Sequence, residues 1–203
     1  MMLGLGHDVV DIAAFATQLE ESGGGMRRLF SPRELRQAAI RAQAKHDGEA
    51  VHLAAKWAGK EAVLKAWCEA LSAASLPLPY AVDDFPWPQV EILDDSRGVP
   101  HVALAADPQR RLTESLFPLL HGGGSSDDES VPAAVVVCDD GARPMPARVS
   151  SGRPLPSIAP ASDRSDRSGR FDSEAFGTMV CHLSLSHDGP IASAVVILAA
   201  VFT

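Results

Sequence analysis

The sequence predicts a mixed α+β protein, and three observations support this fold class. The stretch from His52 to Trp67 contains seven Ala or Leu residues and no Pro, a composition that favours a helix. Residues 2–12 alternate between two sets of side chains, which is typical of a strand. Two further pairs of apolar runs, at 89–104 and 179–203, each flank a turn that contains glycine, which predicts paired strands.

The N-terminal strand carries the first candidate site residue, Asp8. The alternation places Asp8 on one face with Gly4 and Gly6, while His7 falls on the opposite, leucine-bearing face, where a structural role is expected. Missing side chains beside a carboxylate would let a ligand or metal approach the backbone closely. The alternative is an Asp that solvent surrounds.

Two helices follow. Residues 13–21 predict a short helix that glycines 23–25 end. Ser31, Pro32 and Glu34 then form a capping box with proline at the first helical position, so a second helix begins here and runs to about Lys45. Five arginines make this the most basic part of the chain, either as a solvated face or as a docking surface for an acidic protein: Arg27, Arg28, Arg33, Arg36 and Arg41.

The central helix carries charges in its apolar stripe. At about 100° per residue, Glu61 and Lys65 share an arc with Trp57, Ala58 and Ala62. The same spacing turns three other side chains away from this arc, namely Lys56, Lys60 and Val63. An exposed Glu–Lys pair four residues apart is an ordinary feature of helices. A partly desolvated pair needs compensation from a metal, a phosphate or each other, so this face is a candidate site.

The second half of the chain changes character twice. Strands flank Gly98, and a helix at 109–120 is limited by Pro118. From His121 the sequence is rich in Gly, Ser, Pro, Asp and Arg without apolar periodicity, apart from one possible strand in VPAAVVVC. Strand alternation returns at Met179. Near the turn that follows, four polar residues are either site residues or satisfied sheet-edge groups: His182, Ser184, Ser186 and His187.

Composition excludes several classes of function. The 203 residues suit one domain, and 46% hydrophobic residues supply a core. No run approaches the roughly 18 apolar residues of a membrane span, and no signal peptide precedes the first strand, so a cytoplasmic protein is expected. The net charge of −8 argues against nucleic-acid binding. Three widely spaced cysteines indicate neither disulfides nor a zinc site.

Three separated stretches resemble the signature of one family. In chain order they are GLGHDVVDI, WAGKEAVLKAW and HLSLSHDGPIASAVVIL, and LFSPRE and EILDDSRGVPHVAL between them fit the same pattern. The chain is therefore similar to the 4′-phosphopantetheinyl transferases, in particular to the short holo-acyl-carrier-protein synthase group. The resemblance implies an α+β fold in which an antiparallel sheet packs on a long central helix, in a homotrimer with sites at the subunit interfaces.

The resemblance also implies an activity. The family transfers the 4′-phosphopantetheine arm of coenzyme A to a serine of apo acyl carrier protein in fatty acid biosynthesis, and releases adenosine 3′,5′-bisphosphate. Asp8 and Glu61 match the ligands of a Mg²⁺ ion, which takes few carboxylates and keeps waters and substrate phosphate. Asp8, Glu61 and Lys65 would be catalytic, and either Glu61 or a metal-bound water would take the serine proton. The coenzyme A contacts would come from Lys60, Lys65, Ser184, Ser186 and His187.

Departures from the family pattern leave alternatives open. Ala14 stands where the family usually has an arginine that contacts the carrier, and Trp67 and Cys68 replace a glycine, so the helix is expected to run on. A single transferase domain is expected, with a core of 1–105 and 179–203 and a largely flexible insertion at 106–178. The alternatives are transfer to carrier domains of polyketide or peptide synthesis, or a non-catalytic coenzyme A-binding subunit.

Overall fold

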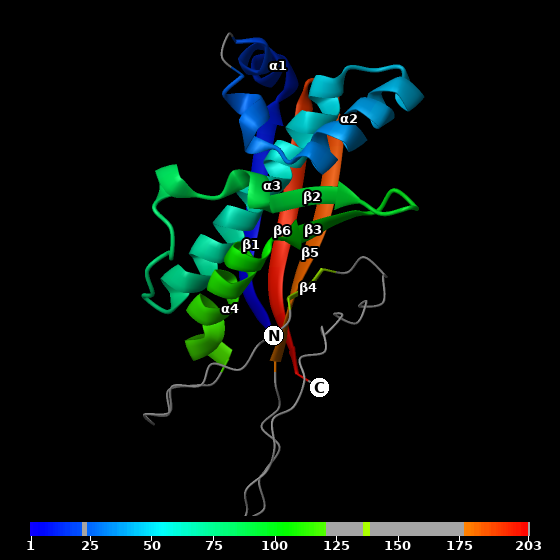
Figure 1. The fold of residues 1–203 in the computed structure, drawn as a ribbon. Helices are drawn as coiled ribbons and strands as arrows, with labels where there is room; N and C mark the ends of the chain where they lie inside the picture. Colours follow the sequence, from blue (N-terminus) through cyan, green and yellow to red (C-terminus); the bar gives the residue numbers. More distant parts are fainter. Residues whose placement is uncertain (22–23, 121–135, 139–176, 203) are drawn as a thin grey trace, which may run out of the picture.

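One face of a twisted sheet carries all the helices of the described structure. The computed structural model describes residues 1–21, 24–120, 136–138 and 177–202 (Figure 1). Strand β1 (Met2–Asp11) pairs antiparallel with β6 (Ile191–Phe202), and β6 pairs antiparallel with β5 (Gly177–Asp188). Strand β4 (Val136–Cys138) adds to β5 in parallel, which gives the order β1-β6-β5-β4.

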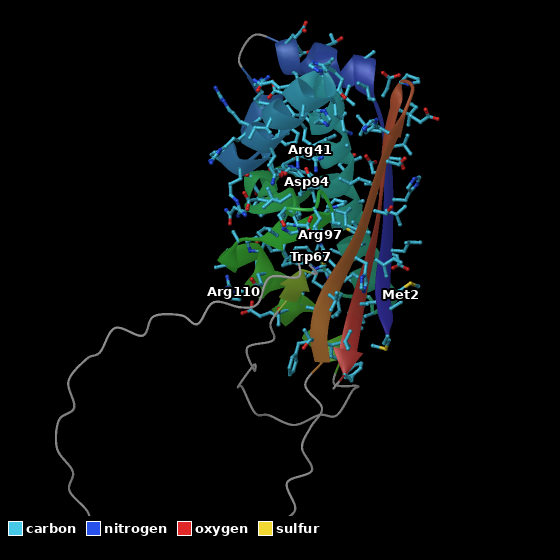
Figure 2. All side chains as sticks on the ribbon, turned by 90° about the vertical axis from the view of Figure 1, so that its right-hand side faces the viewer. Met2, Arg41, Trp67, Asp94, Arg97 and Arg110 are labelled. Carbon is cyan, nitrogen blue, oxygen red and sulfur yellow. The ribbon has the colours of Figure 1, made fainter. Side chains whose placement is uncertain are left out.

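The remaining elements cover one face of this sheet (Figures 1 and 2). The helices are α1 (Ile12–Glu20), α2 (Pro32–Lys45), α3 (Glu49–Ala73) and α4 (Ala106–Leu120). Strands β2 (Val90–Asp94) and β3 (Pro100–Leu104) form a separate antiparallel hairpin that crosses in front of α3. Short 3₁₀ turns complete the set: η1 (Met26–Leu29), η2 (Val82–Asp84) and η3 (Trp87–Gln89).

The predicted capping box forms at the start of α2. The backbone N–H of Glu34 donates to Ser31 Oγ at 3.2 Å, and the backbone N–H of Ser31 donates to Glu34 Oε2 at 2.8 Å. Pro32 follows Ser31 as the first helical residue, where its missing N–H costs nothing. The helix ends at Lys45, because His46 adopts a left-handed conformation with φ 56°.

Helix α3 is buried on nearly every side, which corrects the expected single apolar stripe. The sheet, α1, α2, the β2–β3 hairpin and α4 all pack against it. Lys56, Lys60 and Val63, which the helical spacing turned away from the stripe, are therefore buried as well. Trp67 is only 1% exposed, and the helix continues past it to Ala73, as expected from the missing glycine.

The glycines of β1 serve the packing of α3, which corrects the idea that they open the backbone to a ligand. A Cβ atom at Gly4 would collide with the carbonyl oxygen of Ala66, and one at Gly6 with that of Ala62. Strand and helix can approach this closely only where the strand lacks side chains. Asp8, two residues further along the same face, is consequently held against α3.

Helix α4 belongs to the packed core, although the sequence placed residue 106 at the start of a flexible insertion. Leu112 and Leu116 are buried, and the Trp67 indole N–H donates to Ser115 Oγ at 2.9 Å. The Tyr80 hydroxyl donates to Asp107 Oδ2 at 2.8 Å and ties the preceding loop to the same helix. The core therefore extends to residue 120. Most of the predicted insertion lies outside the described residues.

The outer face of the sheet points away from every other described element (Figure 2). It exposes an apolar surface: Leu5 is 48% exposed, Val9 52%, Ile191 37% and Val195 36%. His7 lies on this face and its Nε2 is 3.1 Å from Ser193 Oγ. In the described part of the chain, no helix is both long and apolar enough to cross a membrane.

Candidate functional site

Asp8, Glu61 and Lys65 meet where β1 packs against α3. The Lys65 ammonium donates to Asp8 Oδ1 at 2.7 Å. The Asp8 side chain is 7% exposed and that of Lys65 is 53% exposed, so the acid is sheltered while the cation reaches solvent. Glu61 lies one helical turn before Lys65, half-buried on the same side. The expected grouping of these three residues is therefore present in the structure.

The two carboxyl groups of this site repel each other in their ionised forms. Burial first, then the negative charge of Asp8 and a hydrogen bond with Asp8, together raise the pKa of Glu61 from 4.5 to about 7, and the positive charge of Lys65 opposes the shift. A hydrogen bond between two carboxyl groups requires that one of them carries a proton. When Asp8 and Glu61 are both ionised, the single positive charge of Lys65 does not balance their two negative charges.

This excess of negative charge is what a divalent cation would relieve. Asp8 Oδ2 is buried, and when both carboxyl groups are ionised it receives no hydrogen bond from the described residues. Two carboxylates from different elements, one with a free oxygen, suit Mg²⁺, which keeps several waters and binds substrate phosphate. Among the residues that the structure describes, no group of three or more His, Cys, Asp or Glu side chains could hold a metal by itself. Asp8 and Glu61 would therefore hold a Mg²⁺ ion only together with oxygens from water or substrate.

Lys60 does not join this site, which corrects its expected contact with coenzyme A. Its ammonium is fully buried, 2.9 Å from Glu34 Oε2, and donates at 2.6 Å to the carbonyl oxygens of both Trp87 and Val90. The three hydrogens of the ammonium therefore already have acceptors. Lys60 ties α3 to α2 and to the start of β2, while its neighbour Glu61 faces β1.

The residues of β5 lie at a distance from Asp8 within one chain. Strand β6 separates β1 from β5, and Ser184 and Ser186 are exposed on the outer face of the sheet. His187 instead lines a pocket on the inner side. Asp8 and the two serines therefore belong to opposite faces of the sheet, and one chain does not bring them together.

The pocket at His187 is basic, and sequence reasoning missed most of it. It has a volume of about 160 Å³ and lies between α2, α3, the β2–β3 turn and the end of β5. Five of its lining side chains are basic or imidazole groups: Arg41, Lys45, His52, Lys56 and His187. The four-residue spacings Arg41–Lys45 and His52–Lys56 were the available signal, since such pairs share a helix face.

The long central helix, the one-sided sheet and the acid pair describe an α+β protein whose basic pocket suits an anionic ligand. A family model described as the 4′-phosphopantetheinyl transferase superfamily matches residues 4–135. The chain belongs to this superfamily, which confirms the resemblance carried by its three motifs.

Two bacterial relatives and one solved structure extend this comparison. A holo-[acyl-carrier-protein] synthase of Bifidobacterium adolescentis is 45% identical over 202 residues, which cover 97% of this chain and 99% of that protein. One from Bifidobacterium animalis subsp. lactis is 55% identical over 145 residues, covering 68% of this chain but 98% of that protein. The structure titled Chronobacterium ammoniagenes ACPS-CoA complex matches with a TM-score of 0.59 at 23% identity, covering 97% of this chain and 96% of that one. The predicted α+β fold class is confirmed.

Proposed function

We propose that this protein, which transfers 4′-phosphopantetheine from coenzyme A to a serine of apo acyl carrier protein, serves fatty acid biosynthesis in the cytoplasm. The observation that carries the proposal is the Asp8–Glu61–Lys65 cluster, with its sheltered acid pair and its solvent-reaching ammonium. Two relatives of 45% and 55% identity are named holo-[acyl-carrier-protein] synthase, and they support the same activity here.

The reaction is a displacement at phosphorus. The serine oxygen of the carrier attacks the β-phosphorus of coenzyme A, the bond to the bridging pyrophosphate oxygen breaks, and adenosine 3′,5′-bisphosphate leaves. Asp8 and Glu61 would hold Mg²⁺, which supplies positive charge to the pyrophosphate oxygens when bound. Lys65 adds a second cation beside the same phosphates. The serine proton passes to Glu61 or to water.

The basic pocket suits the remaining phosphate of coenzyme A, its 3′-phosphate. Lys45 and His187 line it, and neither forms an ion pair with the described residues. Anionic substrates gain affinity where several cations converge in a concave site. Lys60 has no place in this scheme, because its ammonium is fully occupied inside the core.

A homotrimer with sites at its subunit interfaces accounts for the separation of Asp8 from Ser184 and Ser186. The outer sheet face is apolar and exposed at Leu5 and Val9, and it also carries the two serines. A neighbouring copy would cover the apolar surface and bring its own serines toward another chain's Asp8. Exposed apolar patches of this kind mark interaction surfaces.

The acidic carrier protein would dock on the basic segment from Arg27 to Arg41. Three of its five arginines are engaged within the chain, since Arg27 pairs with Glu49 at 2.9 Å, Arg33 with Glu91 at 2.9 Å and Arg41 with Asp94 at 3.6 Å. Arg28 and Arg36 form no ion pair among the described residues. These two are the groups available to an acidic partner, in place of the arginine that Ala14 replaces.

The decisive experiment is mass spectrometry of apo acyl carrier protein incubated with this protein, coenzyme A and Mg²⁺, with and without a chelator. A chelator-sensitive mass gain of one phosphopantetheine group is expected. Glu61→Gln should abolish the gain while the fold is retained by circular dichroism. A mass gain seen only on carrier domains of polyketide or peptide synthesis would show that those domains, and not a fatty-acid carrier protein, are the substrate. Coenzyme A binding with no gain on any carrier would indicate a non-catalytic subunit.

A further inference from the structure

His52, which lines the basic pocket, pairs with Asp47 from the turn before α3, and no motif indicated either residue. His52 Nε2 lies 2.7 Å from Asp47 Oδ1. The His52 side chain is 9% exposed and that of Asp47 is 30% exposed, so the contact is sheltered on the imidazole side. A charge-assisted or neutral hydrogen bond of this length fixes the orientation of the ring.

The backbone places Asp47 for this contact. His46 turns the chain out of α2 with φ 56°, and the Asp47 backbone N–H donates to the Ala42 carbonyl at 3.2 Å. Helix α3 begins two residues later at Glu49, and its first turn carries His52 back toward the Asp47 carboxylate. The turn between the two helices therefore determines the direction of the imidazole.

His52 in turn contacts His187. The two ring centroids are 6.3 Å apart with the ring planes at 89°, an edge-to-face arrangement. His187 is an exposed residue near the end of β5, and its imidazole makes no hydrogen bond or ion pair with the described residues. The edge-to-face contact with His52 is the ring contact that His187 makes among the described residues, and it lies at the pocket wall.

Three other charged groups of the pocket, Arg41, Lys56 and Asp94, are engaged with one another. Asp94 lies 3.6 Å from both Arg41 and Lys56, and the Lys56 ammonium also donates to the Ile92 carbonyl at 2.7 Å. Lys56 is 3% exposed, so a ligand has little access to it. Lys45 and His187 remain as the groups that can meet an incoming anion, and Lys45 is a flexible side chain on the protein surface.

We propose that Asp47 and His52 form a positioning pair that holds His187 in place for a phosphate group of coenzyme A. The inference rests on the proposed binding of the coenzyme A 3′-phosphate in this pocket. Asp47 fixes the imidazole of His52, and the ring of His52 limits the orientations of His187. Restricting a binding side chain before the ligand arrives reduces the entropy lost on binding. The pair should therefore act on affinity for coenzyme A and leave the chemical step at Glu61 and Lys65 unchanged.

Two variants and a control separate this role from a purely structural one. His52→Phe keeps an aromatic ring against His187 but loses the bond to Asp47. Asp47→Ala removes the carboxylate from an exposed turn. His46→Asn is the matched control, since it removes a neighbouring imidazole outside the pocket and Asn tolerates the left-handed conformation. For each variant, KM for coenzyme A and kcat are measured at saturating carrier, together with the dissociation constant for coenzyme A by calorimetry.

We expect His52→Phe and Asp47→Ala each to raise KM and the dissociation constant about three- to tenfold, with kcat within about twofold of wild type. The double variant should have the same KM and dissociation constant as either single variant, because both substitutions remove the same hydrogen bond between Asp47 and His52. Unchanged KM, or a loss confined to kcat, would overturn the proposal. If His52→Phe does not fold, Asp47→Ala decides alone. A wild type that binds coenzyme A without transferring it would contradict the proposed function, and the dissociation constants would still test the pair.

Discussion

At the scale of single residues, burial decides which charged groups take part in chemistry. Lys60 and Glu61 are adjacent in sequence, yet α3 turns one into the core and the other toward β1. Burial lowers the pKa of Lys60 and raises that of Glu34, and the two groups compensate by their ion pair and by further hydrogen bonds. The pair is therefore a structural cross-link between α2 and α3.

Removing one member of this cross-link should be costly. Lys60→Met leaves the Glu34 carboxylate buried without its cation, and we expect a loss of about 3–5 kcal/mol in the free energy of unfolding, measured by urea denaturation. The double variant Glu34→Gln/Lys60→Met should recover much of the loss, because no buried charge remains and the Gln side-chain oxygen can still accept a backbone N–H. Lys45→Met, on the surface, should change stability by less than about 0.5 kcal/mol. A Lys60→Met protein of wild-type stability would contradict the structural role.

Glu61 gives the stability of the metal-free protein a pH dependence. Its pKa is raised from 4.5 to about 7, so the folded state retains a proton that the unfolded state loses between these values. The contribution of Glu61 to the free energy of unfolding therefore decreases as pH rises from about 4.5 to 7, and it is constant above pH 7. Because Glu61 is partly exposed and solvent screens its charge, we expect ionised Glu61 to lower the free energy of unfolding by about 1–2 kcal/mol.

The variant Glu61→Gln tests this sign directly. In the presence of a chelator, it should be more stable than wild type at pH 8 by about 1–2 kcal/mol and similar to wild type near pH 5. Thermal unfolding of both proteins across this range measures the difference. A variant that is less stable than wild type at pH 8 would show that the ionised Glu61 contributes favourably to the fold.

At the scale of elements, the contact between β1 and α3 brings the acid pair together. Gly4 and Gly6 allow α3 to approach, and Asp8 follows on the same face at the point where Glu61 and Lys65 pass. The strand and the helix are fixed locally by alternation and by helix-forming residues. Their separation is fixed by the absence of two side chains.

A single methyl group should disturb this contact. Gly6→Ala places a Cβ atom against the Ala62 backbone carbonyl, which cannot rotate away as a side chain can. We expect a loss of about 2–3 kcal/mol in the free energy of unfolding and a marked loss of transfer activity, because Asp8 moves with the strand. Gly25→Ala, where a Cβ atom would meet open space, should change neither quantity appreciably. Equal stability of the two variants would show that β1 and α3 can separate without cost.

At the scale of the whole molecule, this chain is longer than one of its relatives. The Bifidobacterium animalis relative aligns over 98% of its own length but only 68% of this chain, so about a third of this chain has no counterpart there. We propose that the part without a counterpart falls within the insertion. Helix α4, in contrast, packs on Trp67 and belongs to the core.

Deletion of residues 122–173 should accordingly leave a folded, active protein. The deletion retains α4 and the paired strands β5 and β6, and it removes only the short edge strand β4 from the sheet that the structure describes. We expect a melting temperature within a few degrees of the full-length chain and phosphopantetheine transfer within about threefold, measured by carrier mass gain. An insoluble product would show that the deleted segment contributes to the core. A folded product without activity would assign it a role in the site.

The proposed trimer can be tested on the outer face of the sheet. Light scattering should give a mass of about three times the 21.4 kDa of one chain. Val195→Lys places a charge on the exposed apolar face and should yield monomers that transfer poorly, while Gln43→Lys on the exposed side of α2 should remain trimeric. A fully active monomer would contradict sites shared between subunits.

The sequence by itself determined the local elements and the family. Capping at Ser31, alternation in β1 and the composition of α3 depend on neighbours in the chain, and so do the three motifs that identified the superfamily. Asp8, Glu61 and Lys65 were predicted as site residues in this way. Only the tertiary structure decided that the Lys60 ammonium is buried in an ion pair and that α3 packs closely against the glycines of β1. It also decided that α4 packs in the core and that His52 contacts His187. These contacts join residues from elements far apart in sequence, and helical or strand periodicity contains no information about which distant surface will cover a given face.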